Sequence, residues 1–238
     1  MHYTTAICEH ACGYLTGQNA KSEYIFNVSK EITKDMATLL LFHGWRRFGE
    51  RFFRPICEHC TKCESIRVLA DEFEFSKSMK RIFKKNLHTE IKIEQPSLTQ
   101  EKIDLYNCFH ASKTDQKGWE TNQIDAPRYS ETFVDGNYDF ALEIGYYIDN
   151  KLVGLDYIDI LPNGLSSIYF IYNPEYSKYS LGVYSLLIQI EWAKKMGLKY
   201  IYLGWAVREN QSLLYKFDYK PQQILLNRPT LKERAIWK

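Results

Sequence analysis

The second half of the chain carries three runs in which apolar residues alternate with polar ones. The runs are FALEIGYYID, LVGLDYIDIL and LSSIYFIYN, and residues typical of hairpin turns, Asp149-Asn150 and Pro162-Asn163-Gly164, separate them. Because each run has the length of one strand and the turns are short, the pattern predicts a three-stranded antiparallel meander.

A helix and a buried strand are predicted after the meander. Apolar residues recur at helical spacing between Ser180, a candidate N-cap, and Gly197, a candidate C-cap. The run LKYIYLG has the continuous apolar pattern of a buried strand. A short helix near residues 212–216 and a strand near residues 217–219 would complete this half.

The first half is predicted to be less regular. No spacing dominates up to about Asn27, which predicts a coil-rich start, and the aromatic and arginine-rich run WRRFGERFF predicts a basic loop. Residues 65–70 are rich in β-branched side chains and predict a strand. Helices are predicted from about residue 30 to 43 with Ser29 as N-cap, from Ser76 through SKSMKRIFKKN, and from Ser97 to about Phe109 with Leu98, Ile103, Tyr106 and Phe109 facing inward.

This order of elements predicts an α+β fold with two domains. Residues 1–95 are expected to form a small cysteine-containing N-terminal α/β domain. Residues 96–238 are expected to form a GNAT-like domain with a mostly antiparallel sheet flanked by helices. The segment Tyr179–Tyr184 has one glycine and no leading Gln or Arg, so it lacks the pyrophosphate-binding loop of acyl-CoA enzymes.

Composition narrows the class of protein. Of the 238 residues 45% are hydrophobic, which supplies a core and excludes a disordered or fibrous chain. The net charge is only +2, which excludes a polycationic DNA coat but leaves room for a local basic face. No apolar run reaches the roughly 20 residues of a membrane helix, and the first residues do not resemble a signal peptide. We therefore expect a cytoplasmic protein that binds neither membrane nor DNA.

Five of the six cysteines lie in the first quarter of the chain. Cys57, Cys60 and Cys63 are spaced as metal thiolates often are, and Cys12 or Cys8 could supply a fourth ligand. We favour an Fe–S cluster or Zn at Cys12, Cys57, Cys60 and Cys63; buried free thiols are the alternative. Cys108 is assigned to the core of the third helix.

The predicted helix after Ser76 carries a stripe of five cations, which we call the basic stripe. It consists of Lys77, Lys80, Arg81, Lys84 and Lys85, with Met79, Ile82 and Phe83 on the opposite side. A stripe of this kind is by default a solvated helix face. The absence of an intervening acid favours contact with phosphates instead.

Motifs along almost the whole chain are similar to those of the aminoacyl-tRNA–protein transferases. In the first half these are Cys12-Gly13-Tyr14-Leu15, Gly44-Trp45-Arg46-Arg47-Phe48-Gly49, Arg54-Pro55-x-Cys57-x-x-Cys60-x-x-Cys63-x-x-x-Arg67 and Ser76-Lys77-Ser78-x-x-Arg81-x-x-Lys84-Lys85-Asn86. In the second half they are Ser180-Leu181-Gly182-x-Tyr184-Ser185, Tyr202-Leu203-Gly204 and Tyr215-Lys216. Leu15 stands where the arginyl branch has a cysteine.

The resemblance implies transfer of leucine from leucyl-tRNA to the N-terminal α-amine of proteins that begin with Asp or Glu, in the N-end rule pathway of protein degradation. It implies no nucleotide cofactor beyond aminoacyl-tRNA. The short length and the three-cysteine run resemble the bacterial leucyl branch. Three alternatives stay open: an arginyl-tRNA–protein transferase, a GNAT-type enzyme that uses acyl-CoA, and a non-enzymatic cysteine-knuckle module that binds nucleic acid.

The resemblance also suggests roles for individual residues. Arg46 and Arg47 are candidates for the acceptor carboxylate, with Arg54 and Arg67 as rivals, because an arginine fork suits a carboxylate. Ser180, Gly182 and Tyr202 are assigned to the aminoacyl-adenosine end, and the basic stripe to tRNA. Tyr169, Tyr172, Trp205 and the pair Tyr215-Lys216 are either ordinary core residues or contacts of the tRNA end. No residue is singled out as the proton acceptor.

Overall fold

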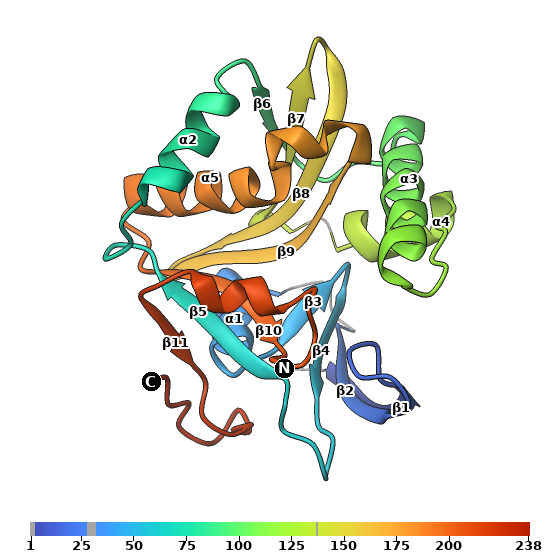
Figure 1. Cartoon of the computed structure of the whole chain (residues 1–238). Helices are drawn as coiled ribbons and strands as arrows, with labels where there is room; N and C mark the ends of the chain where they lie inside the picture. The colour runs from blue at the N-terminus through green and yellow to red at the C-terminus, as the bar shows by residue number, and fades with distance from the viewer. Residues whose placement is uncertain (1–2, 28–31, 137) are drawn as a thin grey trace.

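Two sheets organise the chain in a computed structural model that describes residues 3–27, 32–136 and 138–238 (Figure 1). The smaller sheet is antiparallel in the order β1-β2-β4-β3. Its strands are β1 (Tyr3–Ala11), β2 (Asn19–Asn27), β3 (Arg46–Phe48) and β4 (Arg51–Pro55). The predicted coil-rich start and basic loop are therefore wrong. Strand pairing, rather than local pattern, makes these segments regular.

The larger sheet has seven strands in the order β11-β5-β10-β9-β8-β7-β6. They are β5 (Glu64–Leu69), β6 (Glu90–Glu94), β7 (Ala141–Ile148), β8 (Lys151–Leu161), β9 (Gly164–Tyr172), β10 (Tyr200–Ala206) and β11 (Gln222–Ile224). The predicted meander is confirmed as β7–β8–β9, with Asp149 and Asn150 at positive φ in the first turn. The predicted last strand lies instead at β11, where it pairs with β5.

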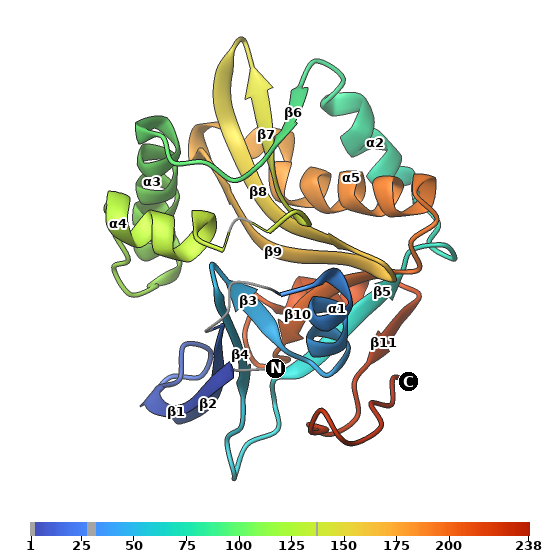
Figure 2. The same ribbon diagram turned by 180° about the vertical axis from the view of Figure 1, so that it is seen from behind.

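Helices cover both faces of the larger sheet (Figure 2). One face packs against α5 (Leu181–Lys195), and α2 (Lys77–Lys85) lies beside α5. The other face packs against α3 (Gln100–Lys117) and the short helices α4 (Ala126–Tyr129) and η1 (Ser130–Val134). Helix α1 (Lys34–Phe42) packs in a third core with the small sheet. No helix in the described ranges is long and apolar enough to cross a membrane.

Strands β9 and β10 are the only parallel pair in the larger sheet, and they soon part. Tyr200–Tyr202 pairs with Gly164–Ser166, after which the two strands diverge. Helix α5 connects the strands, preceded by the 3₁₀ helix η2 (Pro174–Tyr179). This arrangement confirms the predicted α+β, GNAT-like fold. We call the region where β9 and β10 have separated the strand split.

The helices in the structure differ from the predicted ones in three details. Helix α1 begins after Thr33, and the predicted cap Ser29 lies outside the described residues. Helix α3 begins after Thr99 and runs to Lys117, and its predicted inward residue Leu98 is 44% exposed. Cys108 is also exposed, which corrects its assignment to the helix core. The remaining inward residues, Ile103, Tyr106 and Phe109, are buried as predicted.

The predicted domain boundary between residues 95 and 96 concerns which parts of the chain fold independently, and it stays a prediction. In the structure the larger sheet takes β5 and β6 from one side of it and five strands from the other. Strand β11 pairs only with β5 within that sheet. The first half of the chain therefore supplies part of the core on which the second half is built.

Candidate active site

Arg46 lies across the strand split. Its Nη1 donates to the carbonyl of Leu203 on β10 at 3.3 Å, and its Nη2 donates to Ser167 and Ile168 on β9 at 3.1 and 2.6 Å. These carbonyls are free because the two strands no longer pair with each other. Within the described part of the chain no carboxylate forms an ion pair with Arg46. Its positive charge is therefore met by carbonyl dipoles and by the ring of Trp205, whose centroid lies 5.7 Å from Cζ.

Gly204 makes room for this arginine. Its φ is +71°, and a Cβ built on it would lie 1.7 Å from Arg46 Nη1. Any side chain at this position would displace the guanidinium from the strand split. The sequence motif that contains Gly204 was noted, but its dependence on Arg46 could not be seen without the fold.

Lys216 is a second cationic residue at the strand split. It lies in the 3₁₀ helix η3 (Leu214–Asp218) and is 6% exposed. Its Nζ donates to Leu203 O at 2.8 Å and to Trp205 O at 2.7 Å, so it shares the Leu203 carbonyl with Arg46. Burial, and then the charge of Arg46, lowers the pKa of Lys216 well below its ordinary value. Two basic groups are thus held together, and neither forms an ion pair with a carboxylate of the described residues.

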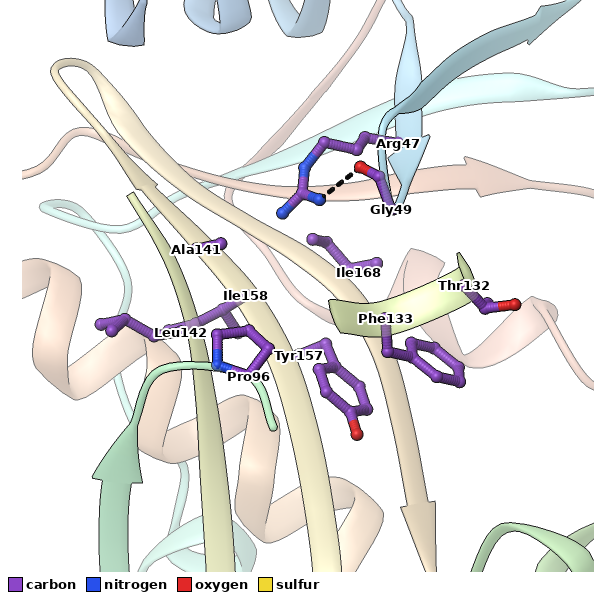
Figure 3. Close-up of a pocket in the computed structure, with 10 residues that line it drawn as sticks. All are labelled: Arg47, Gly49, Pro96, Thr132, Phe133, Ala141, Leu142, Tyr157, Ile158 and Ile168. Atoms are coloured by element: carbon purple, nitrogen blue, oxygen red, sulfur yellow. Dashed lines mark hydrogen bonds between the residues drawn. The ribbon is translucent and has the colours of Figure 1, made fainter. Parts of the chain in front are cut away.

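Arg47 is committed to the core. Its Nε and Nη2 donate to both carboxylate oxygens of Asp159 on β8, and its Nη1 donates to Gly49 O at 2.7 Å. Figure 3 shows the guanidinium bonded to Gly49 O, beside a small cavity lined by apolar residues such as Ile158 and Ile168. Both partners are buried, so Arg47 has no free fork for a substrate carboxylate. This corrects its assignment to the acceptor.

The two rival arginines are also occupied. Arg54 pairs with Glu23 at 2.9 Å and donates to Pro229 O. Arg67 is stacked against the rings of Tyr200 and Trp237 and donates to Gln223. Both side chains are buried, and Arg46 is the candidate that remains.

Asp156 is a buried carboxyl group that the sequence did not single out. It lies on β8 and is fully buried, and its Oδ2 accepts hydrogen bonds from Ser185 and Gln189 on α5. Its Oδ1 has no partner among the described residues. Burial raises the pKa of Asp156 to about 7, against the lowering effect of these hydrogen bonds. A carboxyl group in this setting anchors α5 to the sheet.

The three residues assigned to the aminoacyl-adenosine end do not meet. Ser180 adopts φ +55° without a side-chain cap bond, and Gly182 lies exposed in the first turn of α5 beside Phe170. Tyr202 is 2% exposed on the opposite face, where its hydroxyl contacts Arg67 and Asn163. Adjacent residues of a strand face opposite ways, which separates Tyr202 from the start of α5.

The basic stripe lies on the solvent face of α2. All five of its cations are exposed, and in the part of the chain that the structure describes none of them forms an ion pair. Asn86, which ends the helix, donates to Ile82 O and to Tyr179 O, both at 2.9 Å. This contact fixes the C-terminal end of α2 close to the start of α5.

The cysteines gather at the ends of β1 and β4. Cys63 lies near Cys12, Cys57 and Cys60, and burial raises its pKa to about 12. Arg228 lowers that pKa in part and donates to Cys57 O and Cys60 O at 2.8 and 2.7 Å. However, no three His, Cys, Asp or Glu side chains of the described ranges are placed to hold a metal ion. The present arrangement does not fit the predicted ligand set, which stays a prediction.

Sequence comparisons relate the chain to a family of transferases. Residues 10–81 match the family described as "Arginine-tRNA-protein transferase, N terminus", and residues 101–226 match "Arginine-tRNA-protein transferase, C terminus". An aspartate/glutamate leucyltransferase of Campylobacter jejuni is 43% identical over 96% of this chain and 95% of that protein. One of Helicobacter hepaticus is 39% identical, covering 95% and 93%.

Solved structures are less similar in sequence to this chain. FemX has a TM-score of 0.49 and 8% identity, covering 90% of this chain and 84% of its own. L-PGS from Bacillus licheniformis has a TM-score of 0.45 and 18% identity, covering 79% of this chain and 62% of its own.

Proposed function

The chain belongs to the arginine-tRNA-protein transferase family, and we propose that it transfers leucine from leucyl-tRNA to proteins that begin with Asp or Glu. It is an aminoacyltransferase, whose substrates are an aminoacyl-tRNA and a protein. Leucine is favoured over arginine because relatives that match more than nine-tenths of the chain are named aspartate/glutamate leucyltransferases. Acyl-CoA is disfavoured because the segment before α5 lacks the pyrophosphate-binding loop.

The main support for this proposal is the environment of the Arg46 guanidinium. An acidic N-terminal residue presents a carboxylate, and the guanidinium of Arg46 is a buried cation that no carboxylate of the described residues neutralises. Buried charges are normally paired, so a bound anion would complete this site. Arg46 as a whole residue is only partly buried, which gives the acceptor a route to it.

The leucyl-tRNA is proposed to lie along α2 and the start of α5. The basic stripe would contact phosphates of the acceptor stem, because its cations are exposed and lack protein partners. The Asn86–Tyr179 contact then directs the terminal adenosine toward Ser180 and Gly182. Phe170, whose ring lies beside Gly182, is two residues from Ile168, whose carbonyl Arg46 binds, so both substrates would converge on β9.

The reaction depends mainly on how the enzyme positions its two substrates. Leucyl-tRNA already carries an activated ester, so no covalent enzyme intermediate is needed. The acceptor amine attacks the ester carbonyl, the new C–N bond forms, and the bond to the adenosine oxygen breaks. The enzyme must hold the two substrates together, stabilise the tetrahedral oxyanion and accept a proton.

One assay tests the proposal. The purified protein is incubated with labelled leucyl-tRNA, arginyl-tRNA or acetyl-CoA and with peptides that begin with Asp, Glu, Asn, Arg or Ala. We expect label only from leucyl-tRNA and only on Asp and Glu peptides. Transfer of arginine without leucine would refute the donor assignment, acetyl transfer would refute the class, and equal labelling of Asn peptides would refute the role of a carboxylate.

A further inference from the structure

We propose that Lys216 accepts the proton that the acceptor's α-amine must lose before it attacks the leucyl ester. This inference rests on the proposed function and adds a catalytic residue to it. The first support is position, because Lys216 Nζ and Arg46 Nη1 both donate to Leu203 O, at 2.8 and 3.3 Å. The two nitrogens therefore lie no more than about 6 Å apart.

This separation suits one acidic N-terminal residue. Its α-amine and its side-chain carboxylate are joined by three bonds between nitrogen and carboxyl carbon in Asp and by four in Glu. A carboxylate bound to Arg46 would hold the amine within reach of Lys216. The same pair of residues would thus select the acceptor and activate its nucleophile.

The hydrogen bonds of Lys216 fit an uncharged amine. A neutral lysine has two N–H donors and one lone pair, and Lys216 uses two donors, on Leu203 O and Trp205 O. The lone pair is then left to receive a proton. A protonated lysine would instead bury a third N–H and a second positive charge beside Arg46, in a region where no carboxylate contacts either residue among those described.

The surroundings of Lys216 favour its neutral form, because burial and the charge of Arg46 both lower its pKa well below the ordinary range of lysine. Arg46 approaches from β3, Tyr14 and Tyr215 face Arg46, and Asp156 on β8 acts on Tyr215. Of these groups only Arg46 acts on Lys216 itself, and it favours the neutral amine. Tyr215 is 47% exposed, so the substrate can approach beside it.

The proposed step balances as follows. Lys216 takes one proton from the acceptor's α-ammonium group and becomes an ammonium ion. The free amine attacks the ester carbonyl, the C–N bond forms and the C–O bond to the adenosine 3′-oxygen breaks. The departing oxygen takes the second amine proton and leaves as a hydroxyl group. Lys216 releases its proton to water and regains its lone pair.

Lys216→Ala tests this role. We expect kcat to fall by at least about 100-fold, the usual contribution of a general base, while KM for an Asp peptide and affinity for leucyl-tRNA change little. Added small amines should restore activity, and more basic amines should restore more of it. Lys113→Met is the matched control, because Lys113 is also a buried lysine but lies on α3 next to Tyr172.

Lys216→Arg separates proton acceptance from hydrogen bonding. A guanidinium can still donate to both carbonyls, but it cannot accept a proton near neutral pH. We expect it to be as inactive as the Ala variant. Activity in the Arg variant, or an Ala variant that folds and binds tRNA but is not rescued by amines, would overturn the proposal.

If the variants fail to fold, the pH dependence of kcat/KM of the wild-type enzyme tests the inference instead. The neutral amine is the active form, so kcat/KM for an Asp peptide should rise with pH and level off below the ordinary range of lysine. A value of kcat/KM that falls as the pH rises from about 6 to about 9 would contradict the inference, because a general base gains activity when it is deprotonated. Absence of leucyl transfer by the wild type would refute the proposed function instead, so the two failures are distinct.

Discussion

Arg46 and Arg47 are neighbours with the same side chain, yet their partners give them different uses. Arg47 faces Asp159 and is neutralised within the core, whereas the hydrogen bonds of Arg46 go to backbone carbonyls. Successive residues of β3 point to opposite sides of the small sheet, and this alternation separates them. A structural ion pair and a candidate binding group are thus placed side by side in the sequence.

Arg46→Lys should impair recognition of the acceptor. The change keeps the charge but loses the planar fork that spans both strands, so kcat/KM for Asp and Glu peptides should fall by about 10- to 100-fold. Affinity for leucyl-tRNA, measured by filter binding, should not change. Gly204→Ala should act in the same direction, because its new Cβ would displace the guanidinium. Full activity and full discrimination between Asp and Asn peptides in Arg46→Lys would contradict the assignment.

Asp156 should make the protein less stable as the pH rises. Its pKa is raised from 3.8 to about 7, so between these values the folded state holds a proton that the unfolded chain has lost. The stabilisation is complete below about pH 4 and is lost as the pH passes 7, a change of about 4 kcal/mol by linkage.

Asp156→Asn should remove this dependence. Compared with wild type, urea unfolding should show a gain in stability at about pH 8 that is clearly smaller at about pH 5. Asp218→Asn, at an exposed position, is the control and should change neither value. An equal loss of stability at both pH values would show that Asp156 is ionised in the fold.

Sequence reasoning found part of this site. The motif with Arg46 was visible, and its fork suited a carboxylate, but Arg46 and Arg47 could not be told apart without their partners. Lys216 was noted as ambiguous, because its burial depends on carbonyl groups of a distant strand. Asp156 carried no local motif, and only the packing of α5 on β8 shows that it is buried.

At the level of elements, the basic stripe on α2 gives a prediction about tRNA. Changing Lys80, Lys84 and Lys85 to Ala should raise KM for leucyl-tRNA. It should also flatten the salt dependence of binding by up to about one unit of log–log slope per lost phosphate contact. Preference among acceptor peptides should stay the same. Lys117→Ala on α3 is the control, and an unchanged salt slope in the triple variant would remove α2 from the tRNA surface.

The loop between β4 and β5 holds three of the four cysteines that are predicted to bind a metal. Zinc or iron found by elemental analysis in protein purified without oxygen would support the predicted ligands Cys12, Cys57, Cys60 and Cys63, which would then have to lie closer together than they do in this structure. Cys57→Ala combined with Cys60→Ala should lose that metal, whereas Cys108→Ala should retain it, because Cys108 lies exposed on α3. Metal-free wild-type protein would favour buried free thiols.

Elements with strong local patterns were predictable, and those defined by partners were not. The meander, α2 and α5 carry their own alternation, turns or caps, so the sequence placed them to within a few residues. The hairpin β1–β2 has mostly exposed, mixed faces that show no clear alternation. Strand β11 is three residues long, and its position is set by β5, far away in the sequence.

At the scale of the whole molecule, the sheet that carries the candidate active site is built from both halves of the chain. A fragment of residues 96–238 would expose β10 along one edge and leave β11 without its partner β5. We expect it to be unfolded or aggregated by near-UV circular dichroism and size-exclusion chromatography. Adding residues 1–95 as a second chain should restore some folding. Cooperative unfolding of the isolated fragment would instead support two independent domains.

The pairing of β5 with β11 also fixes an order of events during synthesis. About 160 residues separate Ile66 from its partner Ile224, and ribosomes add roughly 5 to 20 residues each second. For about 10 to 30 seconds, therefore, the nascent chain holds β5 with an open edge, and Arg228 has not yet closed over the Cys57 and Cys60 loop. Chaperone binding and thiol oxidation compete with folding in that interval, so growth temperature and redox state would act on this enzyme mainly while it is being made.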